Sequence, residues 1–444
     1  MLQFLKSIYV HERFYYYMAL VALCFLTSHW VELFFTIALI GALILGILFV
    51  VDITLLFQHK DGIKGSRNLR DQLSNSDPNP IEIELETQYP FPVVLKIIDE
   101  LPKQFQVRDF LMETALKPNE MTKLKYDVTP KERGVYQFGA LNVFASTVLR
   151  IISRRYRFDV ERETAVYPSY IQMRKFEFLA INNRLTEFGL KKIRRIGHTM
   201  EFEQIKNYVN GDDIRTINWK ATAKKGALMV NQYQDEKSQP IYSLIDVGRV
   251  MKMPFNGLKL LDYAINATLA FSNIALLKND KAGMLTFSKK VENLVSASSK
   301  KSNLSVINEV LYKIDTDYLD SDFGYLYGMI KRKINQRSLL ILYTNFEHIS
   351  ALKRQLPYLK GISKSHLLLV VFFENTELDQ VIQENVEDLQ SIYEKTIAMK
   401  FAYEKRLIVK DLEKNGIYSI LTKPQNLSVN VINKYLEFKS KGLI

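Results

Sequence analysis

Two apolar runs at the N-terminus constrain this chain more than any other feature of its sequence. Phe14 to Trp30 reads FYYYMALVALCFLTSHW, and Val31 to Phe57 reads VELFFTIALIGALILGILFVVDITLLF. A membrane-spanning helix needs about 20 apolar residues, so the second run is long enough to tilt and the first is just long enough. We therefore predict a transmembrane helical hairpin over residues 1–60, with Trp30 at headgroup level in a tight external turn.

Basic residues flank this hairpin on both sides, namely Lys6 and Arg13 before it and Lys60, Lys64, Arg67 and Arg70 after it. Positive flanks favour the cytoplasm. The pattern predicts a multi-pass protein of the cytoplasmic (inner) membrane with its soluble domains facing the cytoplasm. A cleaved signal peptide is the alternative, but it lacks a small-residue cleavage site here. A buried helical hairpin of a soluble protein stays open as a second alternative.

The composition limits the classes of partner and of metal site. The 444 residues carry a net charge of +12, which favours an anionic partner such as nucleic acid or an acidic lipid leaflet. We interpret the basic cluster Arg150, Arg154, Arg155 and Arg157 as a solvated or membrane-facing rim, and we expect no nucleic acid. Cys24 is the single cysteine, and the six histidines show no metal-ligand spacing, so no thiolate or histidine metal centre is expected.

After the hairpin the pattern changes to that of β-strands. Ile81, Ile83 and Leu85 alternate with glutamates, which is typical of a half-buried strand. Further short runs follow, with proline and glycine between them. We predict a small antiparallel β-sandwich over residues 65–168, whose ligand, if it has one, the sequence does not reveal.

From residue 237 to residue 444 apolar strands alternate with helical sequence. The predicted strands lack polar alternation and read PIYSLIDV, AGMLTF, SLLILYT, HLLLVVFF and GIYSIL. Such a pattern indicates a doubly wound α/β domain with a parallel sheet covered on both faces. Ligands of open sheets bind at the carboxyl ends of the strands. The sequence Asp246-Val247-Gly248-Arg249-Val250-Met251, at the end of the first strand, is therefore a candidate site.

Residues 169–236 form a predicted linking segment that contains YVNGDDIRTINWKATAKKGALMV. Asp212 and Asp213 could hold two metal ions if strands flanked them and a further carboxylate lay nearby. The residues that follow look helical instead, with Asp212 as N-cap and Gly226 as the stop. We interpret the stretch as a brace between the two soluble domains, in which Trp219 is a buried anchor and Arg215 pairs with a carboxylate or carbonyls. A partner surface that includes Lys220, Lys224 and Lys225 is the alternative.

The order of these parts resembles a bacterial family, the domain-of-unknown-function family fifty-eight. The matching residues of the linking segment are Gly211, Asp212, Arg215, Ile217, Asn218, Trp219 and Ala223, and those of the α/β domain are Asp246, Gly248 and Met251. The resemblance covers nearly the whole chain. It implies a membrane-anchored protein with a von Willebrand factor A-like domain and with a MoxR-type AAA+ ATPase as its partner.

That domain type normally holds Mg²⁺ with Asp-x-Ser-x-Ser, a threonine and a second aspartate. Here Gly248 and Val250 replace the serines, and Asn345, after Thr344, stands where the aspartate is expected. Hard cations need several convergent oxygens, so we predict no tightly held cofactor and at most weak Mg²⁺ binding through Asp246. The alternative is that Asp246 is a helix N-cap or an acid that orders the loop at the end of the strand.

We therefore expect a non-enzymatic membrane-anchored adaptor or scaffold that presents its α/β domain to a cytoplasmic protein. The candidate partner loops contain Asp246, Gly248, Val250 and Met251 on one side and Thr344 and Asn345 on the other. A metal-dependent adhesion receptor is the second hypothesis, and it requires the soluble part to lie outside the cell. An enzyme is the third hypothesis, against which the sequence offers no nucleophile paired with a base and no phosphate-binding loop.

Overall fold

The computed structural model describes residues 7–159, 161–181, 200–210, 212–235, 239–316, 318–383 and 388–444. The chain forms two compact units, Met1–Tyr167 and Pro168–Ile444. Together they hold both helices and sheets, so the protein is of mixed α/β class. Each unit is described below by itself.

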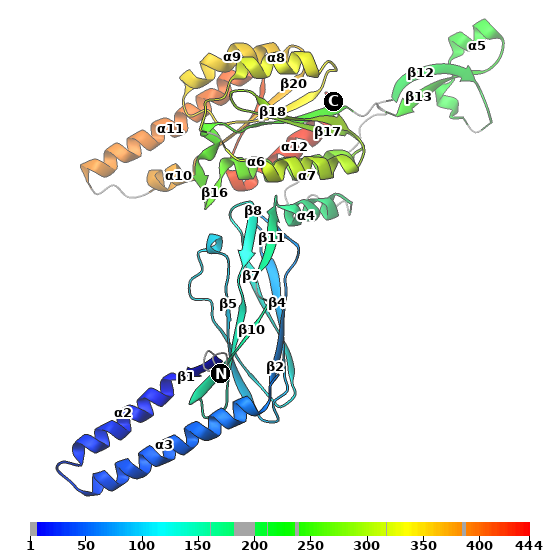
Figure 1. Ribbon diagram of the computed structural model, residues 1–444. Coiled ribbons are helices and arrows are strands. Elements are labelled where there is room, and N and C mark those ends of the chain that lie inside the picture. Colours follow the sequence, from blue (N-terminus) through cyan, green and yellow to red (C-terminus); the bar gives the residue numbers. More distant parts are fainter. Residues whose placement is uncertain are drawn as a thin grey trace. The chain divides into compact units, whose positions relative to one another are not determined.

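The first unit begins with two helices, α2 (Glu12–Thr27) and α3 (Leu33–Gln58), which lie side by side (Figure 1). Within the described residues, two helices are long and apolar enough to cross a membrane, α3 with a mean hydropathy of 2.9 and α6 (Leu260–Leu277) with 1.4. Helix α6 is 89% buried and is a core helix of the second unit, whereas α3 is only 6% buried. The prediction of a membrane span is thus supported for α3, while for α2, with 16 residues, it stays a prediction.

Two antiparallel sheets pack face to face in the first unit. The five-stranded sheet has the order β1-β10-β9-β5-β6, and its strands are Ile8–Val10, Ile152–Phe158, Leu141–Ser146, Val93–Asp99 and Met112–Leu116. The facing sheet has the order β2-β4-β7, with strands Ile63–Asn68, Asn79–Thr87 and Met121–Val128. A third sheet pairs β3 (Gln72–Ser74) and β8 (Gly134–Phe138) with β11 (Arg162–Tyr167).

The alternation in β4 sets the core of this unit. Ile83 and Leu85 are fully buried against Leu95 and Val143 of the other sheet. The alternating Glu82 and Glu84 point away from this core and pair with lysines of β7. The alternation of apolar and charged residues therefore decides which face of β4 is buried, as the sequence predicted.

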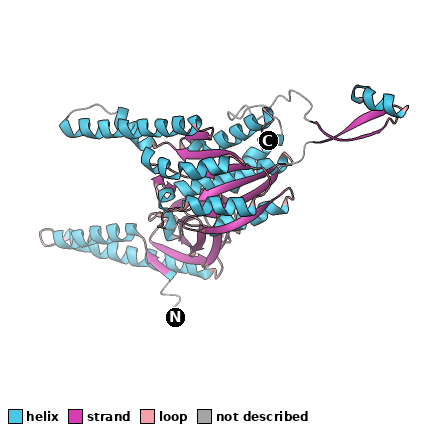
Figure 2. Ribbon diagram, turned by 90° about the horizontal axis from the view of Figure 1, so that it is seen from above, coloured by secondary structure: helices cyan, strands magenta, loops and turns pink. Residues whose placement is uncertain are grey.

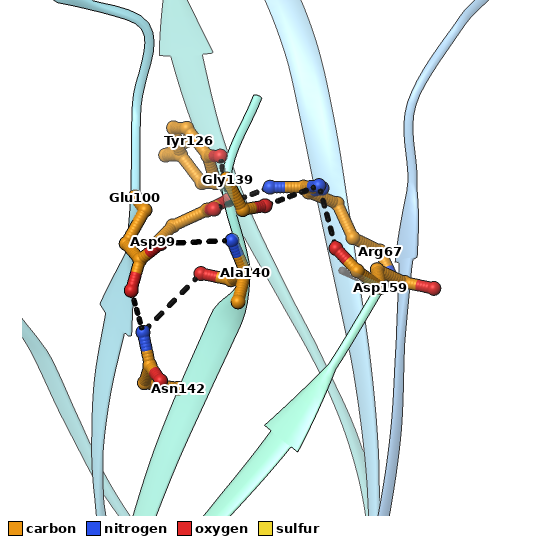
Figure 3. Close-up of polar contacts among 8 residues, drawn as sticks. All are labelled: Arg67, Asp99, Glu100, Tyr126, Gly139, Ala140, Asn142 and Asp159. Carbon is orange, nitrogen blue, oxygen red and sulfur yellow. Dashed lines mark hydrogen bonds and ion pairs between the residues drawn. The ribbon is translucent and has the colours of Figure 1, made fainter. Parts of the chain in front are cut away.

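A buried ion pair ties three parts of the first unit together (Figure 3). Arg67 Nη1 lies 2.5 Å from Asp99 Oδ1, and both side chains are fully buried. Arg67 also donates to the carbonyl of Gly139 at 3.0 Å, and the Tyr126 hydroxyl donates to Asp99. Burial raises the pKa of Asp99 more than the Arg67 guanidinium lowers it. Arg67 is thus an interior residue, although the sequence analysis counted it among the charges that flank the membrane helices.

The second unit contains a six-stranded sheet of order β18-β17-β14-β19-β20-β21. Its strands, in that order, are Val291–Ser298, Lys281–Phe287, Pro240–Asp246, Leu339–Tyr343, Leu367–Phe373 and Tyr418–Thr422. Five strands are parallel, as predicted, but β18 is antiparallel to β17. The sequence analysis missed β18 because only a short turn joins it to β17, so no helix separates the two strands.

Helices cover both faces of this sheet (Figure 1). Helices α4 (Tyr170–Ile181), α6, α7 (Ser302–Lys313) and α12 (Leu427–Ser440) pack on one face. Helices α8 (Phe323–Lys333), α9 (Ile349–Ser363) and α11 (Leu389–Lys414) pack on the other, and the short α10 (Thr376–Gln383) contacts α11. The chain leaves β14 first toward β17 and later toward β19. The carboxyl end of β14 is therefore a switch point of the sheet, where open α/β sheets bind ligands.

Candidate functional site

Asp246 is the last residue of β14 and is fully buried. One carboxylate oxygen accepts a hydrogen bond from the Thr344 hydroxyl at 2.6 Å, just after β19. The other accepts from the Gly248 backbone N–H at 2.9 Å and from the Ser321 hydroxyl. The structure thus brings Asp246 and Thr344 together, as their positions after neighbouring parallel strands predict, and adds Ser321 from a segment that the sequence analysis did not select.

Gly248 occupies a place where no side chain fits. A Cβ there would lie 2.2 Å from the Ser321 Oγ atom and 3.0 Å from the Leu319 carbonyl oxygen. Arg249 N–H donates to that same carbonyl at 3.0 Å, so the segment before α8 lies directly on the loop after β14. The missing side chain at position 248 is therefore compensated by a hydroxyl that arrives from Ser321.

The loop after β14 faces two environments. Met251 is fully buried in the core beneath α6, and Val250 packs partly against the same core. Arg249 is exposed and pairs with the equally exposed Asp320 at 3.2 Å. The apolar side chain of Met251 therefore anchors the loop from below and does not itself face a partner.

Asn345 is buried beside a lysine from α11. Lys405 Nζ donates to Asn345 Oδ1 at 2.6 Å, and the ammonium lies 5.9 Å from the centre of the Phe372 ring. In the described part of the chain, no carboxylate pairs with this lysine within ion-pair distance. Burial lowers the pKa of Lys405 to about 8, and the nearby Glu347 opposes the shift.

Two recesses adjoin this polar cluster. One, of about 260 Å³, is lined by Asp246, Ser321 and Thr344 and by charged residues that include Arg249 and Arg354. The other, of about 310 Å³, has a mainly apolar wall to which Phe255, Leu378, Phe373 and Phe401 contribute, and Lys405 also lines it. The two share Asn345, Glu347 and His348 as a common border. His348 contacts Glu404 at 3.1 Å and the ring of Phe401.

The donor set does not fit a tightly bound divalent cation. Asp246 supplies one carboxylate and Ser321 and Thr344 supply two hydroxyls, but hard cations take six or more oxygens from carboxylates, carbonyls and waters. The Asn345 oxygen is already engaged by the Lys405 ammonium. No cluster of three or more histidine, cysteine, aspartate or glutamate side chains occurs among the residues that the structure describes.

The second candidate stretch belongs to a two-stranded antiparallel ribbon of β12 (Met200–Asn207) and β13 (Met229–Asp235). A short helix, α5 (Trp219–Lys225), lies in the connection between the two strands (Figure 2). Gly211 lies outside the described residues. Asp212 pairs with Lys206 at 2.9 Å and accepts from the Val209 N–H, and Asp213 caps a 3₁₀ turn. Strands do flank the acids, but each acid already has a local structural partner.

The helix of this ribbon is shorter than predicted and begins later. Asn218, not Asp212, is its N-cap, because Asn218 Oδ1 accepts from the Ala221 N–H at 3.0 Å. Gly226 ends the helix in a left-handed conformation (φ 70°), as the sequence predicted. Trp219 is 70% exposed, so the expected buried anchor is wrong. Arg215 lies in the 3₁₀ turn, and its backbone N–H, not its guanidinium, donates to Asp213 at 3.0 Å.

Residues 204–398 match the family model described as "Protein of unknown function DUF58". This match supports the assignment of residues 204–398 to the DUF58 family. The matched region includes the ribbon helix, Asp246, Ser321 and Thr344 but ends before Lys405. A Bacillus subtilis (strain 168) relative, "Uncharacterized protein YeaD", is 26% identical over 184 residues. That alignment covers 39% of this chain and 45% of the relative, so less than half of the relative is spanned.

Solved structures give only weak likenesses to this protein. The conserved hypothetical protein BatB from Bacteroides thetaiotaomicron aligns over 46% of this chain and 100% of its own, with 13% identity and a TM-score of 0.32. A PapD-like domain of human CEP192 aligns over 24% of this chain and 83% of its own, with 12% identity and a TM-score of 0.17. TM-scores this low do not establish a shared fold.

Proposed function

We propose that this DUF58 protein is a non-enzymatic, membrane-anchored adaptor that presents the carboxyl edge of its sheet to a cytoplasmic protein. The observation that carries the proposal is the way in which Asp246 is used. Thr344, Ser321 and Gly248 together occupy both oxygens of its carboxylate, so Asp246 holds three segments in place. Such an arrangement holds the loops of a recognition surface in fixed positions.

The α/β domain is, in this proposal, of the von Willebrand factor A type. Five parallel strands with helices on both faces, an antiparallel edge strand and an aspartate at the end of the first strand support that assignment. Its cation site is replaced by a set of internal contacts. The Ser321 and Thr344 hydroxyls satisfy Asp246, and the Lys405 ammonium supplies a positive charge beside Asn345.

The two recesses offer the chemistry of a protein-binding surface. An apolar hollow that contains Phe255 and Phe401 adjoins a rim that contains Arg249, Arg354 and Glu347. Protein interfaces combine aromatic anchors with a charged, solvent-accessible border in the same way. A MoxR-type AAA+ ATPase, the partner that the family resemblance implies, is the proposed occupant.

Membrane anchoring is supported by the exposed apolar surface of the two N-terminal helices. Helix α3 holds 26 residues, and many of its large apolar side chains are at least half exposed, including Ile40, Leu43 and Ile47. Helix α2 exposes Leu20, Leu23 and Leu26 to a similar degree. Lipid would cover both helices in the proposed hairpin, and the basic flanks favour a cytoplasmic position for the soluble units.

The test is co-purification of the full chain from its native cells in mild detergent. We expect an AAA+ ATPase to be recovered with the wild type and lost with the charge reversals Arg249→Glu and Glu347→Lys. Both side chains are exposed, and both line the smaller, charged recess. Lys441→Glu is the matched control. Lys441 is the C-cap of α12, which starts after β21 and runs back toward the amino ends of the strands, the edge of the sheet opposite the recesses. Equal recovery of the ATPase with all three variants would refute the proposed surface.

A further inference from the structure

The base of the helical hairpin is built into the core of the first unit. Leu56 of α3 is fully buried, and Phe49, Ile53 and Phe57 pack against the same core. The Leu56 carbonyl accepts hydrogen bonds from the Tyr89 hydroxyl and from Arg154, both at 2.7 Å. The last two turns of α3 therefore belong to the folded unit and are not available to cross a lipid bilayer.

Asp52 marks where the lipid-facing part of α3 ends. Its side chain is fully buried within an otherwise apolar helix. It accepts from the Thr147 hydroxyl at 2.5 Å and from the Ile152 N–H at 2.9 Å, so protein and not lipid surrounds it. The stretch from Leu33 to Val51 is about 28 Å long at about 1.5 Å per residue, close to the hydrocarbon thickness of a bilayer.

Helix α2 leaves the same end of the unit without a linker. Strand β1 pairs with β10, the His11 N–H donates to the Ile151 carbonyl at 3.0 Å, and α2 begins at Glu12. Helix α2 is therefore joined directly to the five-stranded sheet, and α3 is held against β10 of that sheet by the hydrogen bonds of Asp52 and Leu56. Domains tethered by flexible linkers tumble freely, whereas this connection leaves almost no freedom.

The loop between β9 and β10 lies at the level of Asp52. Thr147 at its start and Ile152 at its end both donate to the Asp52 carboxylate. Between them, Val148 is 66% exposed and Leu149 is 41% exposed. Arg150 follows, and its charge lies near His11, where it and Arg13 add to the effect of burial in lowering the pKa of that histidine.

Aromatic and basic side chains complete a ring at this level. Tyr15, Tyr16 and Tyr17, in the first turns of α2, are between 47% and 72% exposed. Tyrosine collects at the boundary between headgroups and acyl chains, and arginine binds the lipid phosphates beyond it. Apolar loop tips beside such a ring are suited to the same boundary.

We propose that Val148 and Leu149 insert into the headgroup boundary of an anionic bilayer, with Arg13 and Arg150 at the lipid phosphates. This inference rests on the proposed membrane anchoring and adds to it the depth and rigidity of the anchor. The membrane surface then lies at the level of Asp52, and the five-stranded sheet is held directly against it.

The test places a fluorescent depth probe on single cysteines in the full chain, on a Cys24→Ser background. The protein is reconstituted into vesicles of phosphatidylcholine and phosphatidylglycerol. Probes replace Leu149 at the proposed boundary, Leu43 midway along the proposed span, and Val135 as the control. The side chain of Val135 is 51% exposed. Val135 lies in β8, before the start of β9, whereas the loop that contains Leu149 follows the end of β9, so the two positions lie beyond opposite ends of that strand. Lipid-bound quenchers report depth, and iodide reports exposure to water.

We expect iodide to quench the probe at Leu149 several-fold more slowly than the probe at Val135, and shallow lipid quenchers to reach it. The probe at Leu43 should respond only to deep lipid quenchers. If the protein floats with the vesicles but Leu149 is as open to iodide as Val135, the depth assignment is overturned and the anchoring stands. Failure to float with vesicles would overturn both. In a Leu149→Asp variant that folds normally, a probe placed beside position 149 in the same loop should become more accessible to iodide.

Discussion

We expect Arg67→Met to lower the free energy of unfolding of the first unit by about 3–5 kcal/mol, the range for removing one partner of a buried ion pair. Both Arg67 and Asp99 are fully buried, so the variant leaves a carboxylate without a countercharge or water. The Tyr126 hydroxyl remains as a donor to Asp99, but it carries no charge. Methionine is close to arginine in volume but has a shorter side chain, so part of the loss comes from packing.

A second variant separates the cost of the unpaired charge on Asp99 from the cost of lost contacts. Arg67→Met combined with Asp99→Leu and Tyr126→Phe removes the charge, its countercharge and the remaining hydroxyl together. Replacement of a complete buried ion pair by apolar residues is often neutral, so this triple variant should be more stable than the single one. Arg162→Met is the control, because its pair with Asp71 at 2.9 Å is exposed and contributes about 0–1 kcal/mol.

The dependence on pH gives an independent check. The pKa of Asp99 is already raised in the folded wild type, and loss of Arg67 raises it further. A carboxyl group whose pKa is raised in the folded state destabilises the fold at pH values above its pKa in the unfolded chain, about 3.9. At such pH values the group is ionised in the unfolded chain but not fully ionised in the folded one. The loss caused by Arg67→Met should therefore shrink as the pH falls toward that value.

Hydrogen exchange of the full chain in detergent micelles measures these differences, through peptides that cover β4 and β5. Their opening free energies should fall in Arg67→Met and recover in large part in the triple variant. If Arg67→Met costs no more than Arg162→Met at neutral pH, the buried pair does not hold the two sheets together and the reasoning is wrong.

Further predictions concern the second unit. The Lys405 amine should react with an acylating reagent with a midpoint near pH 8, well below that of an ordinary lysine, as followed by peptide mass spectrometry. Because that pKa is lowered, stability should rise with pH between about 8 and about 10.4, and Lys405→Met should abolish the rise. Thr344→Val should cost about 1–3 kcal/mol by leaving Asp246 short of a donor, as measured by urea denaturation. Calorimetry with Mg²⁺ should give no micromolar isotherm. Trp219→Ala should change stability by less than about 0.5 kcal/mol, since its side chain is exposed.

The sequence was most informative where one periodicity dominates a segment. The alternation of Ile81, Ile83 and Leu85 predicted the buried face of β4, and all three side chains are fully buried. The apolar runs that became β14 and β19 are likewise buried along their length, apart from the half-buried Tyr242 in β14. In these elements the local pattern and the tertiary environment agree, so a single chain suffices for prediction.

Sequence reasoning failed where contacts between distant segments decide the outcome. Ser321 contributes to the Asp246 cluster because the segment before α8 folds over Gly248, and no local motif announces that contact. Lys405 is one of many lysines in and around a long helix, and only the tertiary fold brings its amine to Asn345. Trp219 was assigned to a core because tryptophan is usually buried, yet on this two-stranded ribbon its side chain is exposed, and Met229 and Val230 are buried instead.

Three buried carboxylates share one role in this chain, and that role bears on function. Asp52 binds Thr147, Asp99 binds Arg67, and Asp246 binds Thr344, at sequence separations of 95, 32 and 98 residues. Each replaces lost hydration with donors from a distant segment, so each fastens two parts of the chain. A chain whose interior charges are used in this way holds its exposed surfaces in fixed positions. Pre-organised surfaces lower the entropic cost of association, which is the physical requirement for an adaptor that binds both lipid and protein.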